Sequence, residues 1–154
     1  MIGARYNPGT YVRGSNTLGQ FALFLGQELF NPPDVSGWKL NLGWINTSTL
    51  LNRYTYADFL SVSRTGNPDE PGLWIFHQQL KSLAKKNAKK TVKKFLEVLG
   101  PLDVGSSTRR ILIDYLNADD RGNPAGFSPD DPTVDKKIRG LVHLIMCLSE
   151  FQLG

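Results

Sequence analysis

A run of apolar residues near the end of the sequence constrains the fold more than any other feature. Between residues 134 and 148, apolar residues recur at the three- and four-residue spacing of one helix face. This stripe consists of Val134, Ile138, Leu141, Val142, Ile145 and Leu148. Leu144, Met146 and Cys147 widen it almost around the whole helix. A helix that is apolar on nearly all sides must be covered by other elements, so we expect it to be the most buried helix of the fold.

Further segments with helical spacing lie upstream and are separated by stretches that contain proline and glycine. We expect helices over residues 18–29, 47–62 and 73–99 (the last in one or two pieces), and another that contains residues 111–116. Pro32 and Pro33 are expected to end the first helix, because neither has an amide hydrogen to donate. No segment shows the alternation of apolar and polar residues that is typical of a half-buried strand. The predicted fold class is therefore all-α, with about five helices joined by long loops rich in proline and glycine.

Residues suited to capping precede several of these helices. Asn46 and Thr47 are expected to cap the second helix, and the serine and threonine residues of segment 106–108 the fourth. Asp131 stands before Pro132, a residue type that is favoured in a first helical turn. This pair therefore marks the expected start of the last helix.

Composition limits the class of protein. Together, 15 glycines and 9 prolines make 24 of 154 residues, more than the usual share of about 12%, which indicates long connections. The single cysteine, Cys147, excludes an internal disulfide. No apolar segment approaches the ~20 residues of a membrane span, and residues 1–17 lack the apolar stretch of an export signal. We expect one helical domain over residues 1–154, with an irregular lead-in at residues 1–16.

Patterns typical of catalytic sites are scarce. The two histidines, His77 and His143, fall on different predicted helices, and no His/Cys spacing is that of a metal site. No phosphate loop, dinucleotide-binding motif or nucleophile elbow is present. We expect Cys147 to be a small buried residue, and the aspartates of residues 118–132 to form turns and caps. The sequence predicts no catalytic residue, cofactor or metal, and we expect that this chain alone is not an enzyme.

Two tryptophans six positions apart form the first candidate site. Trp38 and Trp44 could make a flat apolar platform on which a sugar ring or another ligand stacks. Asn41, Asn46 and Arg53 would then supply the polar edges of that ligand site.

The same residues also have a purely structural interpretation. The two tryptophans would fill the space between two helices, since each ring buries roughly 200 Å². Asn46 would then cap a helix, and Arg53 would pair with Glu28 or Asp34. The sequence leaves both interpretations open.

A run of lysines forms the second candidate site. Its members are Lys81, Lys85, Lys86, Lys89, Lys90, Lys93 and Lys94. On one continuous helix they would cover about half of the circumference, opposite a row of apolar residues. Such a face could lie on an anionic surface, bind nucleic acid or hold an acidic glycan, or it could simply be solvated. No arginine or aromatic residue is interleaved, which argues against sequence-specific binding of nucleic acid.

Several short motifs occur in a characteristic order along the chain. They are Gly26-Gln-Glu-Leu-Phe30, Pro32-Pro-Asp-Val-Ser-Gly-Trp38, Trp44-Ile-Asn-Thr47 followed by Arg53, and the closing Ser149-Glu-Phe-Gln152. This order resembles the C-terminal part of the bacterial family known as domain of unknown function 1800. The similarity is specific over residues 25–53 and 139–152 and vague between them. One departure is Ser149, where members of that family commonly have a proline.

The resemblance implies a helical bacterial protein that is exported or periplasmic. Without it, a chain that shows no export signal would be expected in the cytoplasm. Complete members of the family are several times longer, so the resemblance also implies that this chain is the C-terminal portion of a longer protein. It implies no catalytic residue.

Two functions of different classes follow as hypotheses. In the first, the chain is a non-catalytic interaction domain of the bacterial cell envelope that binds another protein or an anionic envelope polymer. In the second, it is the C-terminal lobe of an envelope hydrolase or transferase whose catalytic residues lie in a missing N-terminal part. The second hypothesis predicts a large exposed apolar patch where that other part docks.

Overall fold

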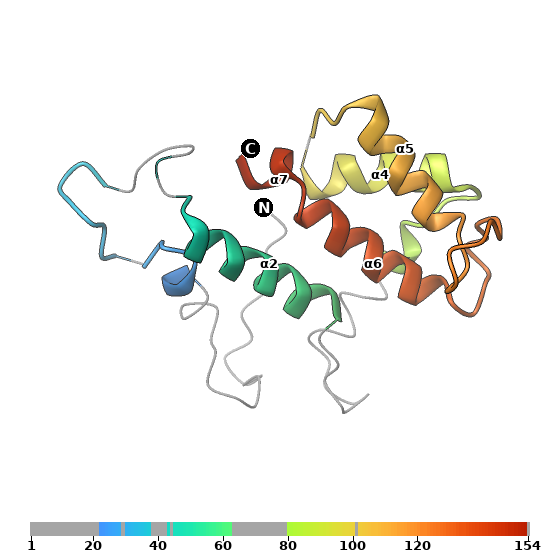
Figure 1. Ribbon diagram of the computed structural model, residues 1–154, viewed down its shortest axis with the longest axis horizontal. Helices are drawn as coiled ribbons and strands as arrows, with labels where there is room; N and C mark the ends of the chain where they lie inside the picture. The colour runs from blue at the N-terminus through green and yellow to red at the C-terminus, as the bar shows by residue number, and fades with distance from the viewer. Residues whose placement is uncertain are drawn as a thin grey trace.

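The computed structural model describes residues 22–28, 30–37, 43, 45–62, 80–100 and 102–153. The fold is all-α, as predicted. Its helices are α2 (Thr47–Val62), α4 (Ala88–Leu99), α5 (Ser106–Leu116), α6 (Val134–Met146) and α7 (Ser149–Leu153) (Figure 1). Extended pairing within the described ranges is limited to one isolated bridge between Ala118 and Pro124.

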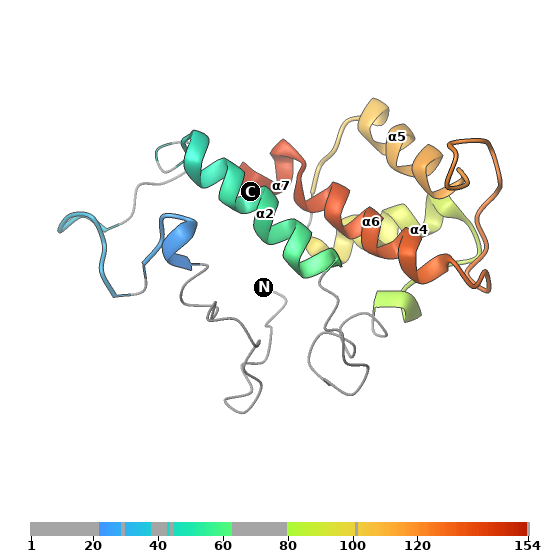
Figure 2. The same ribbon diagram turned by 60° about the horizontal axis from the view of Figure 1, so that its bottom comes forward.

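Helix α6 lies at the centre of the fold, as the width of its apolar stripe predicts. It contacts α2, α4, α5 and α7, with α2 on one side and α4 and α5 on the other (Figure 2). Its buried residues are Val134, Ile138, Leu141, Val142, Ile145 and Met146. They share one core with Val92 and Phe95 of α4 and with Leu112 and Leu116 of α5. Since each large apolar side chain stabilises the fold by roughly 1.5–3 kcal/mol when buried, the six buried residues of α6 contribute substantially to stability.

The apolar stripe predicted to continue to residue 148 does not form one helix. Helix α6 ends at Met146, and the N–H of Cys147 donates to the carbonyl of His143 at 3.0 Å to close its last turn. After Leu148 the chain starts again as α7 at Ser149.

The first predicted helix ends at a glycine and not at the double proline. Residues 22–24 are helical, and Gly26 follows with a φ of 80°, a left-handed value that favours glycine. The N–H groups of Gly26 and Gln27 donate to carbonyls of the preceding turn at 2.9 and 2.8 Å, the Schellman pattern of a helix end. The prediction that Pro32 and Pro33 end this helix is therefore wrong.

A break at residues 83–87 divides the predicted third helix. The side chain of Asn87 accepts a hydrogen bond from the N–H of Lys90 at 2.9 Å and caps α4. The buried hydroxyl of Thr91 accepts from the N–H of Lys85 at 2.9 Å and donates to the carbonyl of Asn87 at 3.0 Å. The predicted third helix is therefore found in two pieces. The seven lysines do not lie on one continuous helix, so that interpretation is wrong.

Helices α5 and α6 start without the predicted side-chain caps. The N-cap of α5 is Gly105, which makes no side-chain cap hydrogen bond, so segment 106–108 lies inside the first turn. The N-cap of α6 is Thr133. Asp131 accepts from the N–H of Thr133 at 2.7 Å, which makes a turn that ends just before the helix and leaves Pro132 outside it.

One aspartate organises the loop between α5 and α6. The carboxylate of Asp119 accepts from the N–H groups of Arg121 and Asn123, both at 2.8 Å, and from the side-chain amide of Asn123 at 3.1 Å. These bonds, those from Asn123 above all, lower the pKa of Asp119. Asp119 thus has the turn-forming role predicted for the aspartates of this loop.

Helices α5 and α6 approach each other closely at Gly140. A Cβ atom at this position would overlap the hydroxyl oxygen of Tyr115 and lie 2.7 Å from its Cζ. Tyr115 is half-buried, and burial raises the pKa of its hydroxyl. The absence of a side chain at Gly140 therefore creates the space that the tyrosine ring occupies.

Candidate functional site

The start of α2 is fixed by a reciprocal pair of hydrogen bonds. The N–H of Thr49 donates to Oδ1 of Asn46 at 2.9 Å, and the N–H of Asn46 donates to Oγ1 of Thr49 at 2.9 Å. This is the geometry of a capping box, with threonine in place of the usual glutamate. The capping role considered for Asn46 is therefore confirmed.

The cap gives a stability prediction. Replacing Asn46 with alanine should lower the free energy of unfolding by about 1 kcal/mol, because the N–H of Thr49 loses the Oδ1 acceptor that caps the start of α2. Asn46→Asp keeps an acceptor at the same place and should change stability by less than about half of that amount. Urea titration followed by circular dichroism measures both. Equal losses in the two variants would contradict a capping role.

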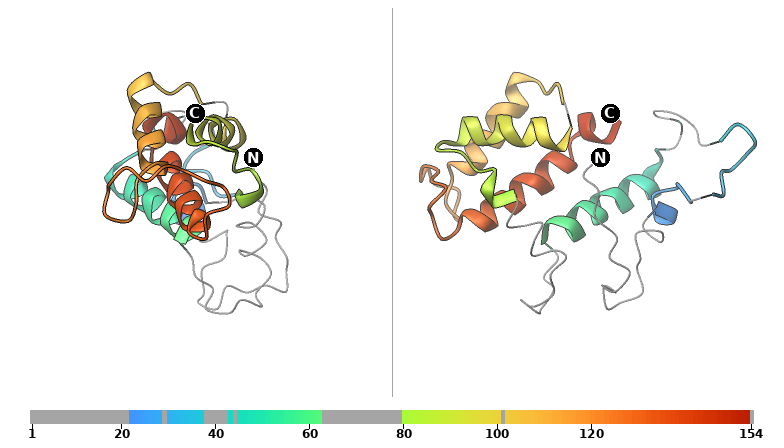
Figure 3. Two further views of the ribbon diagram at one scale, coloured as in Figure 1. Left: turned by 90° about the vertical axis from the view of Figure 1, so that its right-hand side faces the viewer. Right: turned by 180° about the vertical axis from the view of Figure 1, so that it is seen from behind.

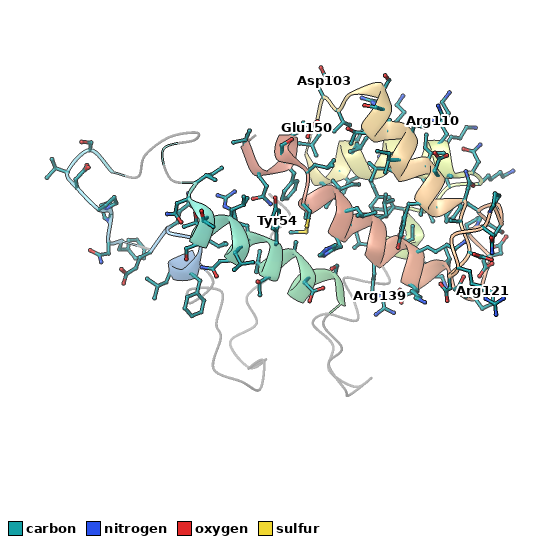
Figure 4. All side chains as sticks on the ribbon, viewed as in Figure 1. Tyr54, Asp103, Arg110, Arg121, Arg139 and Glu150 are labelled. Carbon is teal, nitrogen blue, oxygen red and sulfur yellow. The ribbon has the colours of Figure 1, made fainter. Side chains whose placement is uncertain are left out.

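An arginine on α2 connects this helix to α7, the last helix of the described residues. Nη1 of Arg53 donates to the backbone carbonyl of Gln152 at 3.0 Å and to its side-chain Oε1 at 2.8 Å. Gln152 is buried in α7, and its Nε2 donates to the carbonyl of Met146 at 2.5 Å. Burial lowers the pKa of Arg53 from its ordinary value. Figure 4 labels Tyr54 and Glu150, the neighbours of this junction on α2 and α7.

The junction brings together the two segments on which the family resemblance rests. Arg53 ends the first segment and Gln152 ends the second, 99 residues later. The contact ties the N-terminal half of α2 to α7 and, through Gln152, to the end of α6. Sequence reasoning missed Gln152 as a partner because no periodicity or spacing links positions so far apart.

The tryptophan platform is not tested by these contacts. Trp38 and Trp44 lie outside the described residues, so both interpretations of the pair stay predictions. Of the polar edges proposed for that platform, Asn46 caps α2 and Arg53 binds Gln152. Both side chains therefore make contacts within the fold, and these contacts do not require a ligand.

Residues 30–37 form a projecting loop, which we call the apolar arm. Phe30 is 97% exposed and Val35 is fully exposed, and Figure 1 shows the loop at the end of the molecule away from α5. The loop is held by polar bonds of its own. The side chain of Asn31 donates to Glu28 at 2.7 Å, and Asp34 accepts from the N–H of Ser36 at 2.7 Å.

More exposed apolar side chains lie next to the arm in the sequence and on α2. Leu23 and Phe24 are each about half exposed, and Leu51 is exposed on α2. The side-chain amide of Asn52 donates to the carbonyl of Phe24 at 2.7 Å, which fixes this segment to α2. The arm therefore extends from a part of the fold that is anchored by a defined contact.

A serine, a histidine and the cysteine meet between α2 and α6. Oγ of Ser61 lies 3.4 Å from Nδ1 of His143, and Nε2 of His143 lies 3.7 Å from Sγ of Cys147. No spacing along the chain predicts this group, because Ser61 and His143 are 82 residues apart. Cys147 is only partly buried, so the prediction of a buried cysteine is wrong.

The arrangement of this group does not activate a nucleophile. The hydroxyl of Ser61 already donates to the carbonyl of Ala57 at 2.7 Å, so it cannot also give its proton to His143. Burial, and secondarily the charge of Asp58, raise the pKa of Cys147, which keeps the thiol protonated. We interpret the group as a polar contact between α2 and α6.

The predicted basic residues lie on α4, in the break before it and, for Lys81, in the helical residues 80–82, and we call them the lysine surface. Its members are Lys81, Lys85, Lys86, Lys89, Lys90, Lys93 and Lys94. All are exposed except Lys94, which is partly exposed. Glu97 approaches Lys93 at 3.9 Å and Lys94 at 3.8 Å, but exposed ion pairs of this kind contribute little to stability.

The described residues hold neither a candidate metal site nor a helix that could span a membrane. They contain no group of three or more His, Cys, Asp or Glu side chains that could hold a metal ion. None of their helices combines the length and the apolar character needed to cross a membrane.

The described parts of the chain define an all-α domain with an exposed apolar arm, a lysine surface and no activated catalytic group. The chain belongs to the family described as "Protein of unknown function (DUF1800)", whose model matches residues 7–153. The family resemblance is therefore confirmed over nearly the whole chain. No curated protein and no solved structure matches it.

Proposed function

We propose that this chain is a non-catalytic binding domain of the bacterial cell envelope that contacts a protein partner through the apolar arm. The observation that carries the proposal is the exposure of Phe30 and Val35, two large apolar side chains on one short loop. The location in the envelope rests on the family resemblance alone.

The conformation of the arm supports this function. Phe30 has a φ of 62°, a left-handed value that costs a bulky residue roughly 1–3 kcal/mol. The cost is not offset by burial, because the ring lies in water. Strained residues of this kind cluster at binding sites, where a partner benefits from the fixed geometry.

The chemistry of the arm indicates the kind of partner surface. Aromatic side chains are common energetic centres of protein interfaces when a pocket removes them from water. Over residues 22–37 the charged residues are Glu28 and Asp34, both exposed acids. We therefore propose a partner with an apolar pocket for Phe30 and basic residues around its rim.

The second hypothesis, a lobe of an envelope hydrolase or transferase, would use the same surface. The exposure of Leu23, Phe24 and Leu51 beside the arm favours it, because a docked lobe would bury such residues. The two functions differ in whether the partner is a separate protein or another part of the same polypeptide.

The test is a double substitution on the arm. Phe30→Ser with Val35→Ser should abolish capture of a partner in envelope extract by the immobilised chain. The free energy of unfolding should change by less than about 0.5 kcal/mol, because neither side chain is buried. Partner bands are compared by mass spectrometry after washing.

Ile111→Ser is the matched control, because Ile111 is 64% exposed on α5 and lies away from the arm. It should retain every partner that the unmodified chain captures. An unchanged set of partners in the arm variant would contradict the proposed function. If the captured polypeptide is a longer form of this chain's own protein, the lobe hypothesis is supported instead.

A further inference from the structure

Positive charge is concentrated in one segment of the chain. Residues 80–100 contain seven lysines and one acid, Glu97, which gives a net charge of +6. Because the whole chain has 18 basic and 14 acidic residues, the remainder has 11 and 13 and a net charge of −2. Solubility alone does not require such a separation, since charges of both signs spread over a surface serve it as well.

The position of the lysines on α4 is unfavourable for the isolated helix. Lys89 and Lys90 lie in its first turn, which contains no acid. The helix dipole makes that end positive, so cations there lower helix stability. Within the described residues no ion pair engages Lys85, Lys86, Lys89 or Lys90. An anionic surface would relieve this repulsion.

The shape of the lysine surface selects among anionic partners. The opposite side of α4 is buried in the core through Ala88, Val92 and Phe95, so the helix has no free apolar face to insert into a membrane. In the rear view α4 lies on the near side of the fold (Figure 3, right). A cleft beside α4 is lined by Glu97 as well as by Lys93 and Arg109, so its charge is mixed. Exposed lysines beside a cleft of mixed charge fit a flat anionic surface better than a single polymer chain, which needs a groove of one sign.

We propose that the lysine surface binds the anionic headgroups of a lipid bilayer, and that it does so independently of the apolar arm. The contact is electrostatic, with α4 lying along the membrane surface and its core side facing away. Each lysine close to such a surface strengthens binding about fivefold. Lysine suits this contact because headgroup phosphates at a fluid surface offer no fixed geometry for a bidentate arginine.

The test compares charge-removed variants of the full chain on vesicles. Lys86→Gln, Lys89→Gln and Lys90→Gln together should weaken binding to vesicles of equal parts phosphatidylglycerol and phosphatidylcholine about 100-fold. Binding is measured by co-sedimentation over a series of lipid concentrations. The unmodified chain should lose its binding as sodium chloride is raised and should not bind phosphatidylcholine alone.

The control removes the same charge elsewhere. Arg110→Gln, Arg121→Gln and Lys136→Gln together should lower vesicle binding less than about tenfold, because these side chains lie outside the lysine surface. The lysine variant should unfold at the same or a higher temperature than the unmodified chain, since it loses repulsion at the start of α4. Loss of binding therefore cannot be ascribed to unfolding.

Two results would overturn the proposal. Equal losses in the two triple variants would show that net charge alone drives the binding. Tight, lysine-dependent binding of soluble polyphosphate with none to the anionic vesicles would assign the surface to a polymer. The arm variant Phe30→Ser with Val35→Ser should bind vesicles normally, so failure of one proposal is distinguishable from failure of the other.

Discussion

Replacing Arg53 with alanine should lower the free energy of unfolding by about 3 kcal/mol. The substitution removes two hydrogen bonds from a charged donor to Gln152. It also leaves the side-chain oxygen of Gln152, a buried residue, without the guanidinium that it faces. Leaving a buried acceptor unsatisfied is more costly than losing an exposed bond. Urea titration at neutral pH measures the loss.

Two companion variants separate the contact from general effects of truncation. Arg53→Lys keeps the positive charge but not the planar guanidinium group. It should lower the free energy of unfolding by about half as much as Arg53→Ala does. In the double variant Arg53→Ala with Gln152→Ala, the combined loss should be smaller than the sum of the single losses by at least about 1 kcal/mol. Strict additivity would show that the two side chains stabilise the fold separately.

Gly140→Ala should destabilise the fold by about 2 kcal/mol, although alanine is the better helix former. The new methyl group would overlap the hydroxyl of Tyr115 and crowd its ring. The ring must then move away from α6, which opens the contact between α5 and α6. Thermal unfolding followed by circular dichroism gives the measurement.

Gly100→Ala is the matched substitution, because a Cβ there would meet Leu102 at an ordinary 3.5 Å. It should change stability by less than about 1 kcal/mol. Tyr115→Ala should remove most of the penalty of Gly140→Ala when the two are combined. If Gly140→Ala instead raises the melting temperature, the close approach of Tyr115 is not rigid.

The helices with strong apolar periodicity were the predictable part of the fold. Helix α2 begins next to Asn46 because that residue caps it, and α6 spans most of the last stripe because its apolar face is buried. The errors lie at helix ends, where a few local bonds compete with that periodicity. At Gly26 a left-handed residue stops the first helix early, and at Asn87 a side-chain cap, held by Thr91, starts a new one.

The candidate site was less predictable than the fold. Asn46 could be recognised as a cap because capping is local in sequence. The partner of Arg53 and the group around His143 depend on how α2 and α6 pack, which spacing along the chain does not encode. The exposure of Phe30 was also beyond prediction, since an apolar residue beside a helix end is expected to pack against it.

The order in which the elements are synthesised gives the central position of α6 another consequence. Helices α2, α4 and α5 leave the ribosome before the helix on which all three pack. At roughly 5–20 residues per second, several seconds pass between the synthesis of α2 and that of α6, the helix that it contacts most. The nascent chain therefore exposes the apolar core residues of α4 and α5 to chaperones until residues 134–153 emerge, and the bond from Arg53 to Gln152 can form only then.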